Sequence, residues 1–152
     1  MRFIKLAIIS FVLLFGMLTA ISLLIPSTVR ISKAIDLTAP KDSVRLLITD
    51  TTQWHNWHPA YQNNQKQQAT IKIDSVTDSL ITATISSPGK NSLHNGWQFY
   101  THGERESYTL QWYIDFKLRW YPWEKFGSLF YESTYGKMVE QGLSNVKNHV
   151  QP

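Results

Sequence analysis

Apolar and polar side chains alternate without a break over residues 108–120. The apolar positions are Tyr108, Leu110, Trp112, Ile114, Phe116, Leu118 and Trp120. A period of two predicts a half-buried antiparallel strand, or two strands that share a bend. At about 25 cal/mol per Å² and about 150 to 250 Å² per ring, each buried aromatic residue contributes about 4 to 6 kcal/mol before entropy is subtracted. We therefore expect the other elements to be organised around this stretch.

Shorter runs with the same period predict the rest of an antiparallel sheet. They cover residues 29–37, 71–74 and 81–85, and a further strand carries Trp97 and Phe99. Turn-forming residues separate these runs near Asp78, over 87–91, and at Gly103 and Glu104, and the polar stretch 63–68 predicts a solvated connection. Consecutive strands at hairpin spacing favour one curved antiparallel sheet.

Two segments have helical rather than strand periodicity. Ala39 and Pro40 predict a helix start, followed by an apolar stripe of Val44, Leu47 and Ile48. At the C-terminus, Tyr135, Val139, Leu143, Val146 and Val150 are spaced four, four, three and four residues apart. This spacing predicts an amphipathic helix long enough to cover a sheet. Gly142 lies beside that stripe, so the helix can approach the sheet closely or leave space beneath it.

The N-terminal segment is hydrophobic and contains no charged residue from 6 to 25. A helix of this length measures about 30 Å, the thickness of the hydrocarbon core of a bilayer. The sequence therefore predicts a transmembrane anchor over 1–26 and a folded domain over 27–152. A cleaved signal peptide is the alternative, but Leu18 and Ala20 would occupy the two small positions of its cleavage site, and Leu is too large.

Charges beside the span predict its orientation. Arg2 and Lys5 stand close to its N-terminal end, and Arg30 and Lys33 follow it at a greater distance. Positive charge is retained on the cytoplasmic side. We therefore expect a single-pass protein with a cytoplasmic N-terminus and the domain on the periplasmic or extracytoplasmic side.

Composition excludes several classes of function. The chain of 152 residues contains no cysteine, which rules out disulfides, thiolate metal sites and a lipidated cysteine. After the hydrophobic segment the chain has 13 Lys and Arg and 11 Asp and Glu, and these charges are interspersed. Nucleic-acid binding would need a basic patch or stripe, so no nucleic-acid partner is predicted. The length after the anchor suits one domain.

Two packing motifs resemble a known superfamily. The first combines Ala39 and Pro40 with Val44, Asp50, Trp54 and Trp57, and the second combines Gly136 with Glu140, Gly142, Leu143, Asn145 and Lys147. Together with the order of elements, they make residues 27–150 similar to the SRPBCC superfamily, which contains START domains, Bet v 1-like proteins and polyketide cyclases. The resemblance implies an α+β helix-grip fold, a curved antiparallel sheet wrapped around a long C-terminal helix. Many small bacterial members also carry an N-terminal membrane span.

The resemblance implies a cavity between the sheet and the last helix that binds a lipid, a sterol or a polyketide-like compound. The expected lining residues are Trp97, Phe99, Trp112, Ile114, Phe116 and Leu143. The same side chains could instead pack directly under the helix, and that alternative stays open. The Gly-rich loop of the Bet v 1 plant proteins has no counterpart here, so their ligand chemistry is not carried over.

Candidate chemical groups are sparse. His55 and His58 have the spacing of a metal-binding pair, but a third ligand is not evident, and both are expected at the surface or at a helix cap. Asp115 falls on the polar face of its strand. The sequence therefore predicts no catalytic residue, no metal and no cofactor, and it gives no indication of the oligomeric state.

Trp120, Tyr121 and Trp123 lie close to Lys125, a combination typical of membrane interfaces. This segment is a candidate second contact with lipid, and packing on the rim of the domain is the alternative. Two further functions remain open for the domain. A structural or interaction module of the cell envelope would have a solid core, whereas an enzyme of the cyclase or hydrolase kind would need polar groups inside the cavity.

Overall fold

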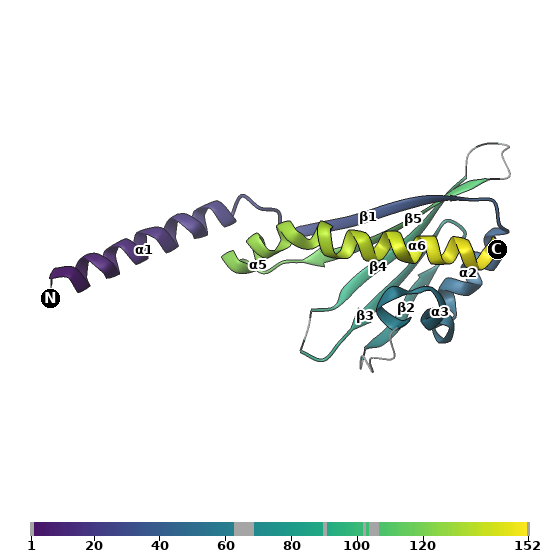
Figure 1. Cartoon of the computed structure of the whole chain (residues 1–152), viewed down its shortest axis with the longest axis horizontal. Helices are drawn as coiled ribbons and strands as arrows, with labels where there is room; N and C mark the ends of the chain where they lie inside the picture. Colours follow the sequence, from purple (N-terminus) through teal and green to yellow (C-terminus); the bar gives the residue numbers. More distant parts are fainter. Residues whose placement is uncertain (1, 63–68, 90, 102, 104–106, 152) are drawn as a thin grey trace.

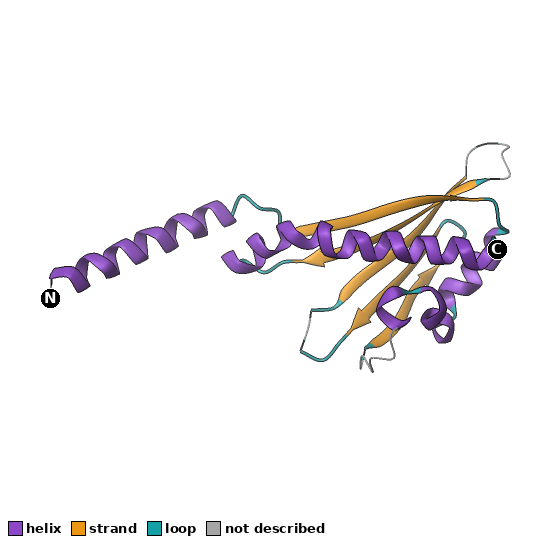
Figure 2. Cartoon of the chain, in the orientation of Figure 1, coloured by secondary structure: helices purple, strands orange, loops and turns teal. Residues whose placement is uncertain are grey.

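The computed structural model describes residues 2–62, 69–89, 91–101, 103 and 107–151. It has an α+β architecture in which a curved five-stranded antiparallel sheet is crossed by a long C-terminal helix (Figures 1 and 2). The strands are β1 (Thr28–Leu37), β2 (Thr70–Val76), β3 (Leu80–Ser86), β4 (Leu93–Thr101) and β5 (Tyr108–Lys117), in the spatial order β1-β5-β4-β3-β2. The expected helix-grip fold is therefore confirmed. The polar connection 63–68 and the turn residue Glu104 lie outside the described residues.

Strand β5 occupies the position that its alternation predicts. It pairs with β1 on one side and β4 on the other, and its buried positions are every second residue from Tyr108 to Phe116. The pattern ends with the strand at Lys117, because the chain then leaves the sheet towards helix α5 (Pro122–Gly127). Leu118 is half-buried and Trp120 is 61% exposed, so the prediction that Trp120 joins the inner face is wrong.

The segment between β1 and β2 folds into short helices that close one end of the sheet. Helix α2 (Lys41–Thr49) is followed by a 3₁₀ turn (Thr51–Gln53), then α3 (Trp54–Trp57) and α4 (Pro59–Gln62). Trp54 Nε1 donates a hydrogen bond to the carbonyl of Ile48 at 2.8 Å, and Trp57 Nε1 donates to that of Leu47 at 3.2 Å. These bonds attach the two tryptophans of α3 to α2.

Four buried tryptophans form the centre of the core. Trp54, Trp57, Trp97 and Trp112 are each at most 1% exposed. The ring of Trp112 lies 5.5 Å from that of Trp97 and 5.6 Å from that of Trp57, measured between centroids. Rings at such distances and inclined to each other are in favourable contact. This part of the interior is therefore solidly packed.

Helix α6 (Lys137–Val150) lies across the sheet and is preceded by a π-helical turn (Glu132–Gly136). It buries Val139, Leu143 and Val146, as the spacing predicts. A Cβ atom on Gly142 would stand 2.4 Å from Cζ3 of Trp112. Glycine at this position therefore lets the helix approach the tryptophan cluster, which is the first of the two arrangements that the sequence left open.

Helix α1 (Arg2–Ser22) extends away from the domain (Figure 1). Among the described residues it is the one helix long and apolar enough to cross a membrane. The chain that follows it is held by Lys125 of α5, whose side chain is 3% exposed. Lys125 Nζ donates hydrogen bonds to the carbonyl of Ile25 at 2.7 Å and to Ser27 Oγ at 2.9 Å. The end of the hydrophobic segment is thus tied to the domain.

Candidate functional site

Two adjoining hollows lie between the sheet and the start of α6. We call the first, of about 330 Å³, the outer hollow, and the second, of about 220 Å³, the inner hollow. The outer hollow reaches Phe116, Leu118 and Glu124, whereas the inner hollow reaches His58, Asn95 and Ile114. Ile85, Ser87, Leu93 and Tyr135 line both. Because they share four wall residues, the hollows form two compartments of one candidate site.

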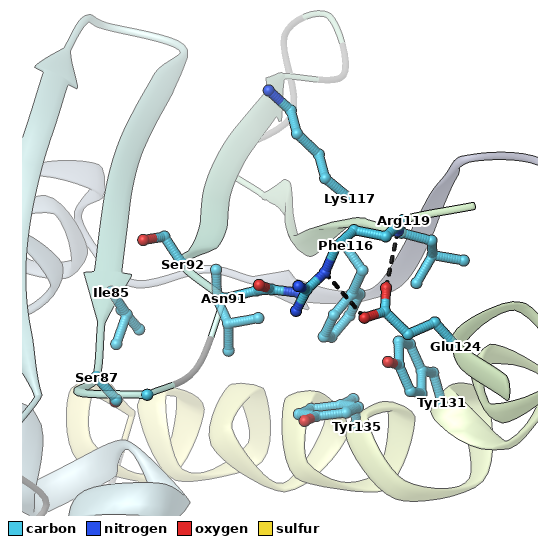
Figure 3. A pocket seen from close by; sticks show the side chains of 13 residues that line it. Ile85, Ser87, Asn91, Ser92, Phe116, Lys117, Arg119, Glu124, Tyr131 and Tyr135 are labelled. Carbon is cyan, nitrogen blue, oxygen red and sulfur yellow. Dashed lines mark hydrogen bonds and ion pairs between the residues drawn. The ribbon is translucent and has the colours of Figure 1, made fainter. Parts of the chain in front are cut away.

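The outer hollow has an aromatic wall and a charged rim (Figure 3). Phe116 projects from β5, and its ring lies 4.7 Å from those of both Tyr131, which precedes the π-helical turn, and Tyr135, which lies within it. Burial raises the pKa of Tyr131 above its ordinary value. On the rim, Arg119 Nε lies 3.0 Å from a carboxylate oxygen of Glu124. These two charges neutralise each other.

The inner hollow contains a histidine that is almost inaccessible to solvent. His58, directly after α3, is 2% exposed, and its ring stacks on Trp54 with the centroids 5.2 Å apart. Burial lowers the pKa of His58 from 6.5 to about 3, because a charged ring would lose its hydration. Its Nδ1 accepts a hydrogen bond from the backbone N–H of Ala60 at 3.3 Å. His58 is therefore a helix cap, as the sequence allows, because it ends α3 and accepts from the start of α4, but it is buried and does not lie at the surface.

Asn95 is the second polar residue of the inner hollow. It points to the inner face of β4, is 2% exposed, and accepts a hydrogen bond from Trp112 Nε1 at 3.0 Å through Oδ1. Neither Asn95 Nδ2 nor His58 Nε2 has a hydrogen-bond partner among the described residues. The sequence offered one signal, because alternation places Asn95 on the same face as Trp97 and Phe99. For His58 the sequence offered no such signal, because the burial of a short helix does not follow from its sequence.

The predicted lining residues separate into three groups. Ile114 lines the inner hollow and Phe116 the outer hollow. Trp97, Phe99 and Trp112 are buried in the core cluster and are absent from the walls of both hollows. Leu143 is 2% exposed and borders a separate depression beside β1. Contact of these six residues with a ligand stays a prediction.

The inner hollow offers hydrogen-bond donors in apolar surroundings, whereas Lys117, Arg119 and Glu124 line the outer hollow. The inner hollow has no Asp, Glu, Lys or Arg among its lining residues, and its apolar walls include Ile85, Leu93, Ile114 and Met138. Across the part of the chain that the structure describes, no three His, Asp or Glu side chains are grouped as a metal site would need. Asp115 lies outside the site and pairs with Arg30 at 2.7 Å. The geometry suits a mostly apolar molecule.

Comparisons with known proteins identify the fold. No protein-family model matches the sequence, and no curated protein matches it. Among solved structures, CalU16 from Micromonospora echinospora is 16% identical with a TM-score of 0.55, covering 80% of this chain and 74% of CalU16. A START superfamily protein from Mycobacterium smegmatis is 13% identical with a TM-score of 0.54, covering 80% of this chain and 97% of that protein.

A third similar structure comes from a biosynthetic pathway. The di-domain ARO/CYC protein StfQ of the steffimycin pathway is 8% identical with a TM-score of 0.58, covering 82% of this chain and 51% of StfQ. At these identities the similarity concerns the fold. The chain thus has the helix-grip fold, with a curved antiparallel sheet and a long C-terminal helix, and shares this fold with these proteins.

Proposed function

We propose that this protein is a membrane-tethered binder of a hydrophobic small molecule, held between the sheet and α6. The observation that carries the proposal is the pair of adjoining hollows, which share Ile85, Ser87, Leu93 and Tyr135. Lipid, sterol and polyketide-like compounds belong to the class of ligand that such walls accept, because binding removes apolar surface from water. The aromatic wall of the outer hollow supports the same class.

The surface next to the anchor supports a role at the membrane. Trp120, Trp123, Leu129 and Phe130 are each more than 60% exposed, and we call them the α5 surface. Helix α5 contacts α1 and lies at the anchor's end of the domain (Figure 1). Tryptophan and other large apolar side chains are favoured at the level of lipid headgroups. In the proposal the α5 surface rests on the bilayer that α1 crosses.

This placement also brings the ligand site close to lipid. Leu118, Arg119 and Glu124 line the outer hollow, and they lie in or beside the segment that carries the α5 surface. A hydrophobic molecule could then pass from the bilayer to the hollow with little exposure to water. The charges at Arg2 and Lys5 support a cytoplasmic N-terminus and a domain on the extracytoplasmic side.

The solid tryptophan cluster favours a second candidate, an interaction module of the cell envelope. Trp54, Trp57, Trp97 and Trp112 fill the centre of the domain and leave the hollows to one end of it. A module of this kind would use its surface and would retain no apolar molecule. The two candidates therefore predict different results for ligand retention.

Native mass spectrometry of the full chain, released from dodecyl maltoside micelles, tests the binding function. We expect the wild-type chain to retain an apolar molecule and the Leu93→Trp variant to lose it, because the larger ring would fill the wall shared by both hollows. Val76→Trp is the matched control, since Val76 is 46% exposed on β2. Equal retention by Leu93→Trp and wild type would place the bound molecule elsewhere, on α1 for example. Absence of any retained molecule would favour the interaction module.

A further inference from the structure

The hydrogen-bond network identifies which polar atoms in the wall of the inner hollow are left without a partner among the described residues. His58 Nδ1 accepts from the N–H of Ala60, so the proton of the neutral ring is assigned to Nε2. The lowered pKa of His58 keeps the ring neutral at physiological pH. His58 Nε2 is therefore a donor, and it has no partner among the described residues.

The amide of Asn95 is oriented by an equally definite contact. An indole N–H can only donate, so the oxygen of Asn95 must face Trp112 Nε1, 3.0 Å away. The Nδ2 amino group of Asn95 then points elsewhere and is buried without a partner in the described part of the chain. Asn95 and His58 both line the inner hollow, so both unused donors belong to side chains of its wall.

Buried donors are almost always paired in folded proteins, because an unpaired one loses its hydrogen bonds to water without replacement. His58 and Asn95, the residues that carry these donors, are each 2% exposed. No described carbonyl, hydroxyl or carboxylate of the protein reaches either donor. A ligand that offers an acceptor oxygen would satisfy them.

We propose that the inner hollow recognises a neutral acceptor oxygen, such as the carbonyl of a ketone, ester or lactone, on an otherwise apolar molecule. His58 Nε2 and Asn95 Nδ2 donate to this oxygen, and the hydrocarbon part extends along Ile85, Leu93 and Tyr135 into the outer hollow. A carboxylate is disfavoured, since no cation lines the inner hollow and burying an unpaired charge is costly. This inference rests on the proposed function and specifies its ligand class.

The test compares two probes of equal chain length, 2-undecanone and undecane, on the full chain in dodecyl maltoside micelles. Each affinity is corrected for the partition of the probe into protein-free micelles. Two neutral hydrogen bonds predict that the ketone binds about ten- to a hundredfold more tightly than the alkane. The carbonyl stretching frequency of the bound ketone is expected below its value in empty micelles. This infrared reading uses only the wild-type chain, so it does not depend on the folding of any variant.

Variants then assign the preference to the two side chains. His58→Phe and Asn95→Leu are each expected to lower the ketone-over-alkane ratio by about three- to tenfold, while undecane still binds. His55→Phe is the matched control, because His55 is exposed on α3, the short helix that ends just before His58. It should leave the ratio unchanged.

The possible failures are distinguishable. Equal corrected affinities for both probes, with an unshifted carbonyl frequency, would overturn the acceptor-oxygen inference and leave hydrophobic binding intact. Tighter binding of undecanoate than of 2-undecanone would overturn the neutrality of the acceptor. Binding of neither probe would remove the proposed function and, with it, this inference.

Discussion

Replacement of Trp112 by alanine is expected to lower the free energy of unfolding by about 3 to 5 kcal/mol, the range for truncating a large buried aromatic residue. Trp112 is inaccessible to solvent, contacts Trp57 and Trp97, and lies directly beneath Gly142. Its loss leaves a void and also removes the donor that Asn95 Oδ1 accepts from. Urea denaturation of the full chain in detergent, followed by far-ultraviolet circular dichroism, measures the change.

Trp123→Ala is the matched control for this substitution. Trp123 is 63% exposed on α5, so its removal is expected to change the free energy of unfolding by no more than about 0.5 kcal/mol. A similar loss for both variants would show that the tryptophan cluster is not the centre of the fold.

Acidification is expected to destabilise the protein through His58. The wild-type chain should lose about 2 kcal/mol of stability between pH 7.5 and pH 5 that the His58→Phe variant does not lose. The folded pKa of His58 is about 3, and its ordinary value is 6.5. Urea denaturation of both chains at the two pH values measures the difference.

The direction of this stability change follows from which state, folded or unfolded, binds the proton. Below pH 6.5 the unfolded chain protonates His58, whereas the folded chain does so only near pH 3, so acid favours the unfolded state across that window. The contribution is fully present above pH 6.5 and is lost as the pH falls. His55→Phe, at an exposed position, should show the wild-type dependence. If His58→Phe did so as well, the ring would be solvated in solution.

The sheet and the last helix could be predicted because the spacing of their apolar residues matches the period of a strand or of a helix. Every second residue of β5 is buried up to Phe116, and α6 buries Val139, Leu143 and Val146 of its predicted stripe. The pattern failed at Trp120, which is exposed and does not join the core. Alternation alone does not distinguish an apolar residue that faces the core from one that stays exposed.

The candidate site was only partly accessible to sequence reasoning. Ile114 and Phe116 were expected at a cavity and line the two hollows. The expected lining residues Trp97 and Trp112 instead pack against each other, because α3 brings Trp54 and Trp57 into the space above them. The position of a short helix depends on tertiary packing. Here α3 covers Trp97 and Trp112, and the outer hollow lies instead beside Tyr131 and Tyr135.

The proposed account connects the anchor, the α5 surface and the hollows in one arrangement. Lys125 ties the end of the hydrophobic segment to α5, and the charged rim of Arg119 and Glu124 stands beside the outer hollow. A ligand taken from the bilayer would meet the aromatic wall first and the donors of His58 and Asn95 last. In this arrangement the apolar walls provide affinity and the two donors provide selectivity.

Photoaffinity labelling tests the central claim most directly. A long-chain ketone that carries a diazirine is incubated with the full chain in membranes, irradiated, and mapped by peptide mass spectrometry. The account predicts adducts on the walls of the hollows, in β3, β4 and the segment around Tyr135, that excess 2-undecanone prevents. Labelling confined to α1 and the α5 surface, and unaffected by 2-undecanone, would contradict a ligand site between the sheet and α6.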